Sequence, residues 1–263
     1  MNKKEQGSTY RVNTLQLLSA VGYASTRQVA RRVWGRCDEP ARRMASRTLR
    51  WLLVHRLVVA KRDGVGVNKA NNELLFALTQ LGVDEARRHG PGLVSNKKHA
   101  RDYLRHSHDH RTACNSVYAA LPYIDCWSEL EVRTGECPIS SFHYSVDGMA
   151  YSKIPDLIAI DEDGCYEWLE VENSWRSEKD LMKVVDCMRA MFSRESSDIK
   201  RMHFVVTVAG ARTIGQRLKK RLTHENDSGW SAPVRMLDAR IIAQHVRVSV
   251  LDAQTLTLHG VPI

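Results

Sequence analysis

The sequence predicts a two-domain protein of the mixed α/β (α+β) class: an N-terminal helix-turn-helix domain with a β-hairpin, followed by a mixed-sheet α/β sandwich. Hydrophobic residues recur at helical spacing in the first part, whereas strand-like and helical segments alternate in the second. The charge is divided in the same way: residues 1–111 carry 22 Lys and Arg against 9 Asp and Glu, whereas residues 112–263 have a net charge of −4. A length of 263 residues, 43% of them hydrophobic, is sufficient for two cores.

The first domain begins with helical segments that have recognisable start and stop residues. Ser25 or Thr26 caps the second segment, Gly35 ends it, and Pro40 stands in the first turn of the third. Hydrophobic spacing places the helices over residues 13–21, 28–34 and 39–56. The order is typical of a helix-turn-helix.

The third helix separates into an apolar and a basic face. The apolar face is formed by Ala41, Ala45, Thr48, Leu49, Leu52 and Leu53. The opposite face carries Arg42, Arg43, Arg47 and Arg50. Such a face can lie against phosphates and reach guanine edges in a major groove, so we expect a recognition helix for double-stranded DNA. An ordinary solvated basic face is the alternative interpretation.

A β-hairpin over residues 57–61 and 73–78 follows, with Lys61 and Arg62 near its tip as further DNA-binding candidates. A short helix over residues 79–88 closes this winged helix-turn-helix. We therefore expect a DNA-binding domain over residues 1–92, a linker over 93–100 and a second domain over 101–263.

The second domain is predicted to open with a helix over residues 100–121. Strands are expected over residues 126–132, 156–160, 166–172 and 203–208. Further helices are expected over residues 177–192 and 213–222.

Three carboxylates are expected to meet where two of these strands pair. Residues two apart share one face of a strand, so Glu170 and Glu172 project together, and a hairpin returns Asp156 beside them. Crowded carboxylates favour a hard divalent cation, so we expect all three to bind Mg²⁺ or Mn²⁺. Such an ion can activate water against a phosphodiester.

The segments Pro155-Asp156 and Glu170-Val171-Glu172 resemble the PD-(D/E)XK nuclease superfamily, whose fold is a restriction-endonuclease-like mixed sheet. The resemblance implies catalytic roles for Asp156 and Glu170, and for Glu172 as a ligand or as the group that orients the attacking water. Glu172 stands where the superfamily usually has lysine.

Other positions can complete this arrangement. Some members of the superfamily move the lysine to the following helix, where the chain offers Lys179 and Lys183, and we take Lys183 as the displaced positive group. Glu129 would supply the additional acidic residue that many members use.

The winged helix combined with such a core resembles the replication-relaxation family and the related plasmid mobilisation relaxases of the MobC class. The resemblance rests on Leu78-Thr79-Gln80-Leu81-Gly82, the helix near His110, Trp127-Ser128-Glu129, Pro155-Asp156, Leu169-Glu170-Val171-Glu172 and Lys183. It implies recognition of an origin on mobile DNA, followed by strand nicking or by control of replication and transfer.

Several patterns also have simpler interpretations. The carboxylate trio would otherwise belong to a degenerate core that no longer cuts, or to solvated surface. His106 and His110 share a helical face, which suits a surface near phosphate, metal ligation or support of catalysis. The basic helix with Arg217, Lys219, Lys220 and Arg221 is either solvated or a non-specific grip on DNA.

Two functional hypotheses follow from these patterns. In the first, the protein binds a specific DNA site and nicks one strand as an Mg²⁺- or Mn²⁺-dependent endonuclease, acting with other transfer or replication proteins. In the second, it is a non-catalytic transcription or replication regulator, which often binds an inverted repeat as a homodimer. The chain has no apolar run that would span a membrane and its six cysteines are widely spaced, so a cytoplasmic protein with reduced thiols is expected.

Overall fold

A computed structural model describes residues 2–62, 73–90, 104, 109–123, 125–193, 197–223 and 232–263. Its chain divides into two compact units. The first contains residues 1–121, 127–136 and 252–257, and the second contains residues 122–126, 137–251 and 258–263. The linker expected at 93–100 and the tip of the expected hairpin lie outside the described residues.

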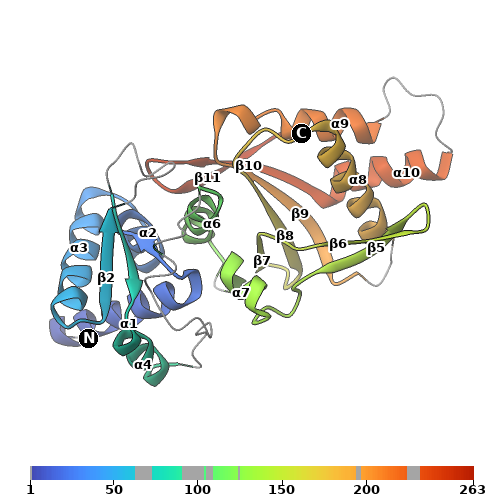
Figure 1. Cartoon of the computed structure of the whole chain (residues 1–263). Helices are drawn as coiled ribbons and strands as arrows, with labels where there is room; N and C mark the ends of the chain where they lie inside the picture. The colour runs from blue at the N-terminus through green and yellow to red at the C-terminus, as the bar shows by residue number, and fades with distance from the viewer. Residues whose placement is uncertain are drawn as a thin grey trace. The chain divides into compact units, whose positions relative to one another are not determined.

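The first unit has the element order of a winged helix, and it confirms the predicted helices and hairpin. Its elements are α1 (Lys3–Val21), β1 (Ala24–Ser25), α2 (Thr26–Trp34), α3 (Glu39–Val54), β2 (Val58–Arg62), β3 (Leu74–Leu78), α4 (Gln80–Arg88), α6 (Asp109–Ala120) and α7 (Glu129–Thr134). The strands form a three-stranded sheet in the order β1-β3-β2, in which β3 is antiparallel to both neighbours (Figure 1).

Local sequence signals begin and end the helices of the helix-turn-helix. Ser25 and Gln28 form a reciprocal capping box at the start of α2, and Gly35 ends this helix in the left-handed conformation with φ of 71°. Asp38 caps α3 by accepting from the amide of Ala41 at 2.9 Å. These caps satisfy backbone groups that a helix end leaves unpaired, so the turn between the helices is specified locally.

Glycine is required at position 82 because α4 lies very close to the backbone of Leu57, the residue that precedes β2. A Cβ atom added to Gly82 would lie 1.9 Å from the carbonyl oxygen of Leu57. Thr79, the cap of α4, donates from its hydroxyl to the carbonyl of Arg56 at 2.7 Å. The Thr79-Gln80-Leu81-Gly82 segment therefore joins the last helix of the winged helix to the hairpin.

Helix α6 belongs to the first unit, which extends past the boundary expected at residue 92. Buried polar contacts fix it there: Gln28 donates to Ser116 Oγ at 2.8 Å, and Asn115 donates to the carbonyl of Tyr23 at 2.8 Å. The Tyr23 hydroxyl also lies 3.0 Å from Thr112 Oγ1. Because buried polar groups need partners, these bonds fix the orientation of α6 on α2.

The strand expected over residues 126–132 is wrong beyond its second residue. Only Cys126–Trp127 is extended, and Ser128 then starts the helix α7 with a capping box that it forms with Glu131. The Ser-x-x-Glu pattern was present in the sequence, but the apolar alternation around it favoured a strand. Burial raises the pKa of Glu131 to about 7, although its hydrogen bonds to Ser128 act in the opposite direction.

The second unit is built on a mixed sheet with helices, as the predicted fold class requires. Its elements are β4 (Cys126–Trp127), β5 (Phe142–Val146), β6 (Met149–Lys153), β7 (Leu157–Ile160), β8 (Tyr166–Glu172), α8 (Glu178–Phe192), β9 (Ile199–Val206), α9 (Ile214–Thr223), α10 (Ala232–Arg240), the π-helical turn Ile241–His245, β10 (Val246–Asp252) and β11 (Thr257–Val261). Six strands pair in the order β11-β10-β9-β8-β7-β4, and β5 and β6 form a separate hairpin.

The centre of this sheet combines both strand directions. Strands β7 and β8 are antiparallel, whereas β8, β9 and β10 are parallel, with α8 in the connection from β8 to β9 (Figure 1). Trp168, Leu169 and Phe204 are completely buried in these strands, and Leu181 and Met188 of α8 are equally buried. Strand β8 thus lies between two paired neighbours, β7 and β9, in the core of the unit.

No helix among the described residues is long and apolar enough to cross a membrane.

Candidate functional site

The β7–β8 hairpin brings the three predicted carboxylates together. Asp156 immediately precedes β7, and its Oδ2 accepts from the amide of Val171 at 2.8 Å. Glu170 and Glu172 are two residues apart and therefore lie on one face of β8. Arg176 contacts both of them there. We call Asp156, Glu170, Glu172, Lys153 and Arg176 the carboxylate site.

Glu170 is held by three side chains, and only 3% of its surface is exposed. Its Oε1 accepts from the indole of Trp168 at 2.7 Å, and its Oε2 accepts from Lys153 Nζ at 2.8 Å. Arg176 Nη2 lies 3.3 Å from the same Oε2. Charge-assisted hydrogen bonds of this kind hold the carboxylate in one orientation.

Arg176 joins the two glutamates. Its Nη2 donates to Glu172 Oε1 at 2.6 Å in addition to its contact with Glu170. Burial opposes the charge of the guanidinium, but Glu172, Glu170 and Asp156 together raise the pKa of Arg176. All three carboxylates therefore lie close enough to act on one cation.

For Glu172, the same surroundings disfavour the charged form of the side chain. Burial raises the pKa of Glu172 above its ordinary value, and the negative charges of Glu170 and Asp156 raise it further against the opposing effect of Arg176. The site thus holds three carboxylates beside two cations, Lys153 and Arg176. The excess of hard oxygen donors fits a divalent cation such as Mg²⁺ or Mn²⁺, which Asp156, Glu170 and Glu172 would hold.

Lys153 was missed by the sequence analysis, which expected Lys183 as the positive group. Lys153 ends β6, three residues before Asp156, whereas the hairpin β5–β6 was not predicted. Lys183 lies on an exposed part of α8 and donates to Asp180 Oδ1 at 3.0 Å. The structure therefore places Lys153, and not Lys183, against the carboxylates.

Glu129 belongs to the first unit, whereas the carboxylate site belongs to the second. It is buried in α7 and forms ion pairs with Arg111 at 3.2 Å and with Arg133 at 2.7 Å. The expectation that it extends a strand was wrong, because Ser128 starts a helix there.

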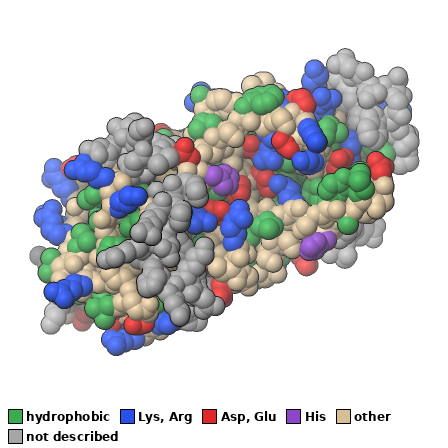
Figure 2. All heavy atoms as spheres, viewed as in Figure 1, with side chains coloured by type: hydrophobic (Ala, Val, Ile, Leu, Met, Phe, Trp, Pro, Cys, Tyr) green, Lys and Arg blue, Asp and Glu red, His purple; other side chains and the backbone are tan. Residues whose placement is uncertain are grey.

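The predicted DNA-binding arginines lie mainly on the outer face of α3. Arg43, Arg47 and Arg50 are exposed, whereas Arg42 is partly buried and pairs with Glu39 at 3.4 Å. Arg43 also pairs with Glu39, and among the described residues neither Arg47 nor Arg50 has an ion-pair partner. Lys and Arg side chains recur over this unit, at the left of Figure 2.

The two DNA-binding candidates of the hairpin, Lys61 and Arg62, differ in their contacts. Arg62 is exposed at the end of β2, whereas the Lys61 ammonium donates to the carbonyl of Leu104 at 3.0 Å. His110 lies at the start of α6, but His106 lies outside the described residues. The histidine pair considered as a metal or phosphate site is therefore only half described.

The opposite face of β8 holds a second buried charged cluster that the sequence analysis did not foresee. Glu167 is fully buried, and its Oε2 lies 3.5 Å from His203 Nδ1, while the other nitrogen of that ring lies 2.9 Å from Ser249 Oγ. Although burial acts against it, the pKa of Glu167 is lowered by His203, Arg247 and Arg201. We call Glu167, His203, Ser249, Arg201 and Arg247 the Glu167 cluster.

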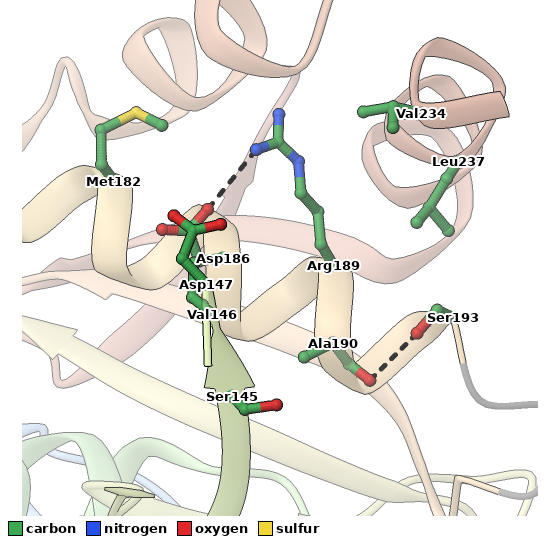
Figure 3. A pocket seen from close by; sticks show the side chains of 10 residues that line it. All are labelled: Ser145, Val146, Asp147, Met182, Asp186, Arg189, Ala190, Ser193, Val234 and Leu237. Atoms are coloured by element: carbon green, nitrogen blue, oxygen red, sulfur yellow. Dashed lines mark hydrogen bonds and ion pairs between the residues drawn. The ribbon is translucent and has the colours of Figure 1, made fainter. Parts of the chain in front are cut away.

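A pocket of about 540 Å³ opens elsewhere in the second unit (Figure 3). Its lining residues are Ser145, Val146, Asp147, Met182, Asp186, Arg189, Ala190, Ser193, Val234 and Leu237. Arg189 forms a two-pronged ion pair with the buried Asp238, at 2.9 and 2.8 Å, and lies 3.4 Å from Asp186. None of the predicted site residues lines this pocket.

Comparison with known proteins gives one family match. The model of a family described as replication-relaxation matches residues 15–186, which include α3, Lys153, Asp156 and all of the β7–β8 hairpin. No curated protein and no solved structure shows significant similarity to the chain.

Proposed function

Because the chain belongs to the replication-relaxation family, we propose that it is a site-specific DNA-nicking protein that acts in the replication or mobilisation of a mobile element. The first unit would bind double-stranded DNA and the carboxylate site would cut one strand. The observation that carries this proposal is the convergence of Asp156, Glu170 and Glu172 with Lys153. It supplies the lysine whose usual position in the PD-(D/E)XK pattern is occupied by Glu172.

The winged-helix element order and the exposed arginines of α3 support the DNA-binding part. Arg47 and Arg50 point away from a buried apolar face formed by Ala41, Ala45 and Leu49. A helix with this division can insert into a major groove while its apolar face remains in the core.

The residues of the carboxylate site have separable roles in strand cleavage. Mg²⁺ or Mn²⁺, when bound by the three carboxylates, supplies Lewis acidity and lowers the pKa of water. Lys153 would stabilise the negative charge that develops on the phosphate oxygens, since its ammonium already lies among the acidic groups. Arg176 would hold Glu170 and Glu172 in a fixed orientation.

The test is nicking of supercoiled DNA from the native locus, with Mg²⁺, Mn²⁺ or EDTA, by the wild type and Asp156→Asn. We expect metal-dependent conversion to open circles by the wild type and its abolition in Asp156→Asn, with DNA affinity nearly unchanged. Glu162→Gln is the matched control, because Glu162 is an exposed acid in the β7–β8 turn. Unchanged nicking by Asp156→Asn would refute the assignment.

A second candidate, a DNA-binding regulator with a non-cutting core, is favoured by the ion pairs of Arg176. These pairs satisfy Glu170 and Glu172 without a metal, as a structural core would require. Tight binding of an operator in EDTA, with no cutting under any condition, would favour this function.

A further inference from the structure

A large aromatic side chain is exposed beside the carboxylate site. Trp175 lies in the loop between β8 and α8, three residues after Glu172, and 60% of its surface is exposed. Tryptophan is normally well buried in a folded chain. The exposure therefore calls for a functional explanation.

The loop that carries Trp175 is anchored on both sides. Thr207 donates from its amide to the carbonyl of Glu172 at 3.1 Å and from its hydroxyl to Asn173 Oδ1 at 3.0 Å. On the other side, Arg176 is bound to Glu170 and Glu172, and Ser177 caps α8. The indole is thus attached to backbone that is fixed relative to the carboxylates.

A cation covers one face of the indole ring. The guanidinium carbon of Arg217, from α9, lies 4.5 Å from the ring centroid. Glu178 positions this arginine by accepting from its Nη2 at 2.8 Å, and it also accepts from Arg221 at 2.8 Å. Only 17% of the Arg217 side chain is exposed, so the cation is held in place under the ring while the ring itself stays open.

We propose that Trp175 is a stacking platform for an unpaired nucleobase of the DNA strand that enters the carboxylate site. An exposed aromatic ring next to basic side chains is the arrangement that binds single-stranded nucleic acid, because every base has a face that can stack. Exposed Lys220 and Arg212 add positive charge on and before α9 for the adjoining phosphates.

This inference rests on the proposed function and deepens it by naming the substrate as locally unpaired DNA. Intact duplex has no free base to stack on a fixed ring, since its bases are stacked on one another. The second unit would accordingly act on a strand that has been separated from its complement.

The test is fluorescence anisotropy with a short fluorescein-labelled oligodeoxythymidine and with a duplex of arbitrary sequence, in EDTA so that no strand is cut. For Trp175→Ala we expect a loss of single-strand affinity of about 5- to 100-fold, with duplex affinity unchanged. Trp175→Phe should retain most of the affinity because it keeps an aromatic face. Met236→Ala is the matched control, since Met236 is 75% exposed on α10 of the same unit.

Each outcome decides the proposal. The proposal would be overturned if Trp175→Ala bound the single strand as tightly as the wild type does. It would also be overturned if Trp175→Ala lost equal affinity for the single strand and the duplex. If the wild type does not nick DNA but Trp175→Ala selectively loses affinity for the single strand, the nuclease function is refuted and a single-strand-binding surface remains. Normal nicking with unchanged binding by Trp175→Ala would remove only the stacking platform.

Discussion

The two faces of β8 differ in the ratio of acidic to basic side chains that they bury. On one face, Lys153 pairs with Glu170, and Arg176 pairs with Glu170 and Glu172. Asp156 is near enough to act on the charge of Arg176, so three acids face two cations. On the other face, Glu167 lies within ion-pair distance of Arg201, Arg247 and His203, and Arg201 also pairs with Asp161 at 3.2 Å. One strand thus supports an acid-rich cluster and a cation-rich cluster, separated only by the alternation of its side chains.

The difference indicates where chemistry would be found. A buried charge is costly unless it is paired, so the numerous cations around Glu167 are sufficient for a structural role. At the other face Lys153 and Arg176 pair with Glu170 and Glu172, but three acids face these two cations. Burial raises the pKa of Glu172 above its ordinary value, and its acidic neighbours Glu170 and Asp156 raise it further. Perturbed pKa values in an acid-rich cluster are typical of sites that bind or react.

The largest expected effect is on nicking, and it separates two lysines. Lys153→Met should lower the nicking rate by about 10²- to 10³-fold, because it removes a charged donor from the carboxylate site. Lys183→Met, its control, removes only an exposed pair with Asp180 and should stay within about 2-fold of the wild type. Rates are measured on supercoiled DNA from the native locus, and the reverse ranking would return the role to Lys183.

Glu167→Gln should act on stability instead of nicking. It leaves His203, Arg201 and Arg247 without their shared carboxylate, which we expect to cost about 3 kcal/mol of unfolding free energy. Chemical denaturation measures the loss, and nicking by the folded fraction should be unchanged. A fall in nicking without a fall in stability would place the chemistry on the Glu167 face.

The two faces should also respond to pH with opposite signs. The pKa of Glu172 is raised above an ordinary value of 4.5, so its contribution to stability is present below that pH and is lost as pH rises through its folded value. The pKa of Glu167 is lowered from the same value, so its contribution is present above pH 4.5 and is lost as pH falls through its folded value.

Unfolding free energies measured across this range test the signs. Relative to the wild type, Glu172→Gln should gain stability as pH rises, and Glu167→Gln should gain stability as pH falls. The same direction for both variants would show that the two faces do not differ in charge balance.

Much of the acidic part of the site was predictable because it depends on short-range geometry. The period of two along β8 pairs Glu170 with Glu172, and a short turn is sufficient to return Asp156 beside them. The contact of Arg176 could also have been predicted, since Arg176 follows Glu172 by only four residues. It was not predicted because the loop that carries Arg176 shows no periodic pattern.

The basic part depends on pairings between distant segments. Lys153 contacts Glu170 only because the chain from β6 returns to β8. Glu129 belongs to a different unit from the carboxylate site because α7 packs in the first unit. Helix α6 likewise joins the winged helix through Gln28 and Asn115, whose partners lie more than 80 residues away in sequence.

The sequence by itself determined the helix caps at Ser25 and Asp38, the basic face of α3 and the common face of Glu170 and Glu172, because each depends on neighbouring residues and a fixed repeat. Only the tertiary structure decided which cation meets these carboxylates and that Trp175 lies open over Arg217. Those contacts join elements far apart in the chain, and the packing of whole helices and strands brings them together.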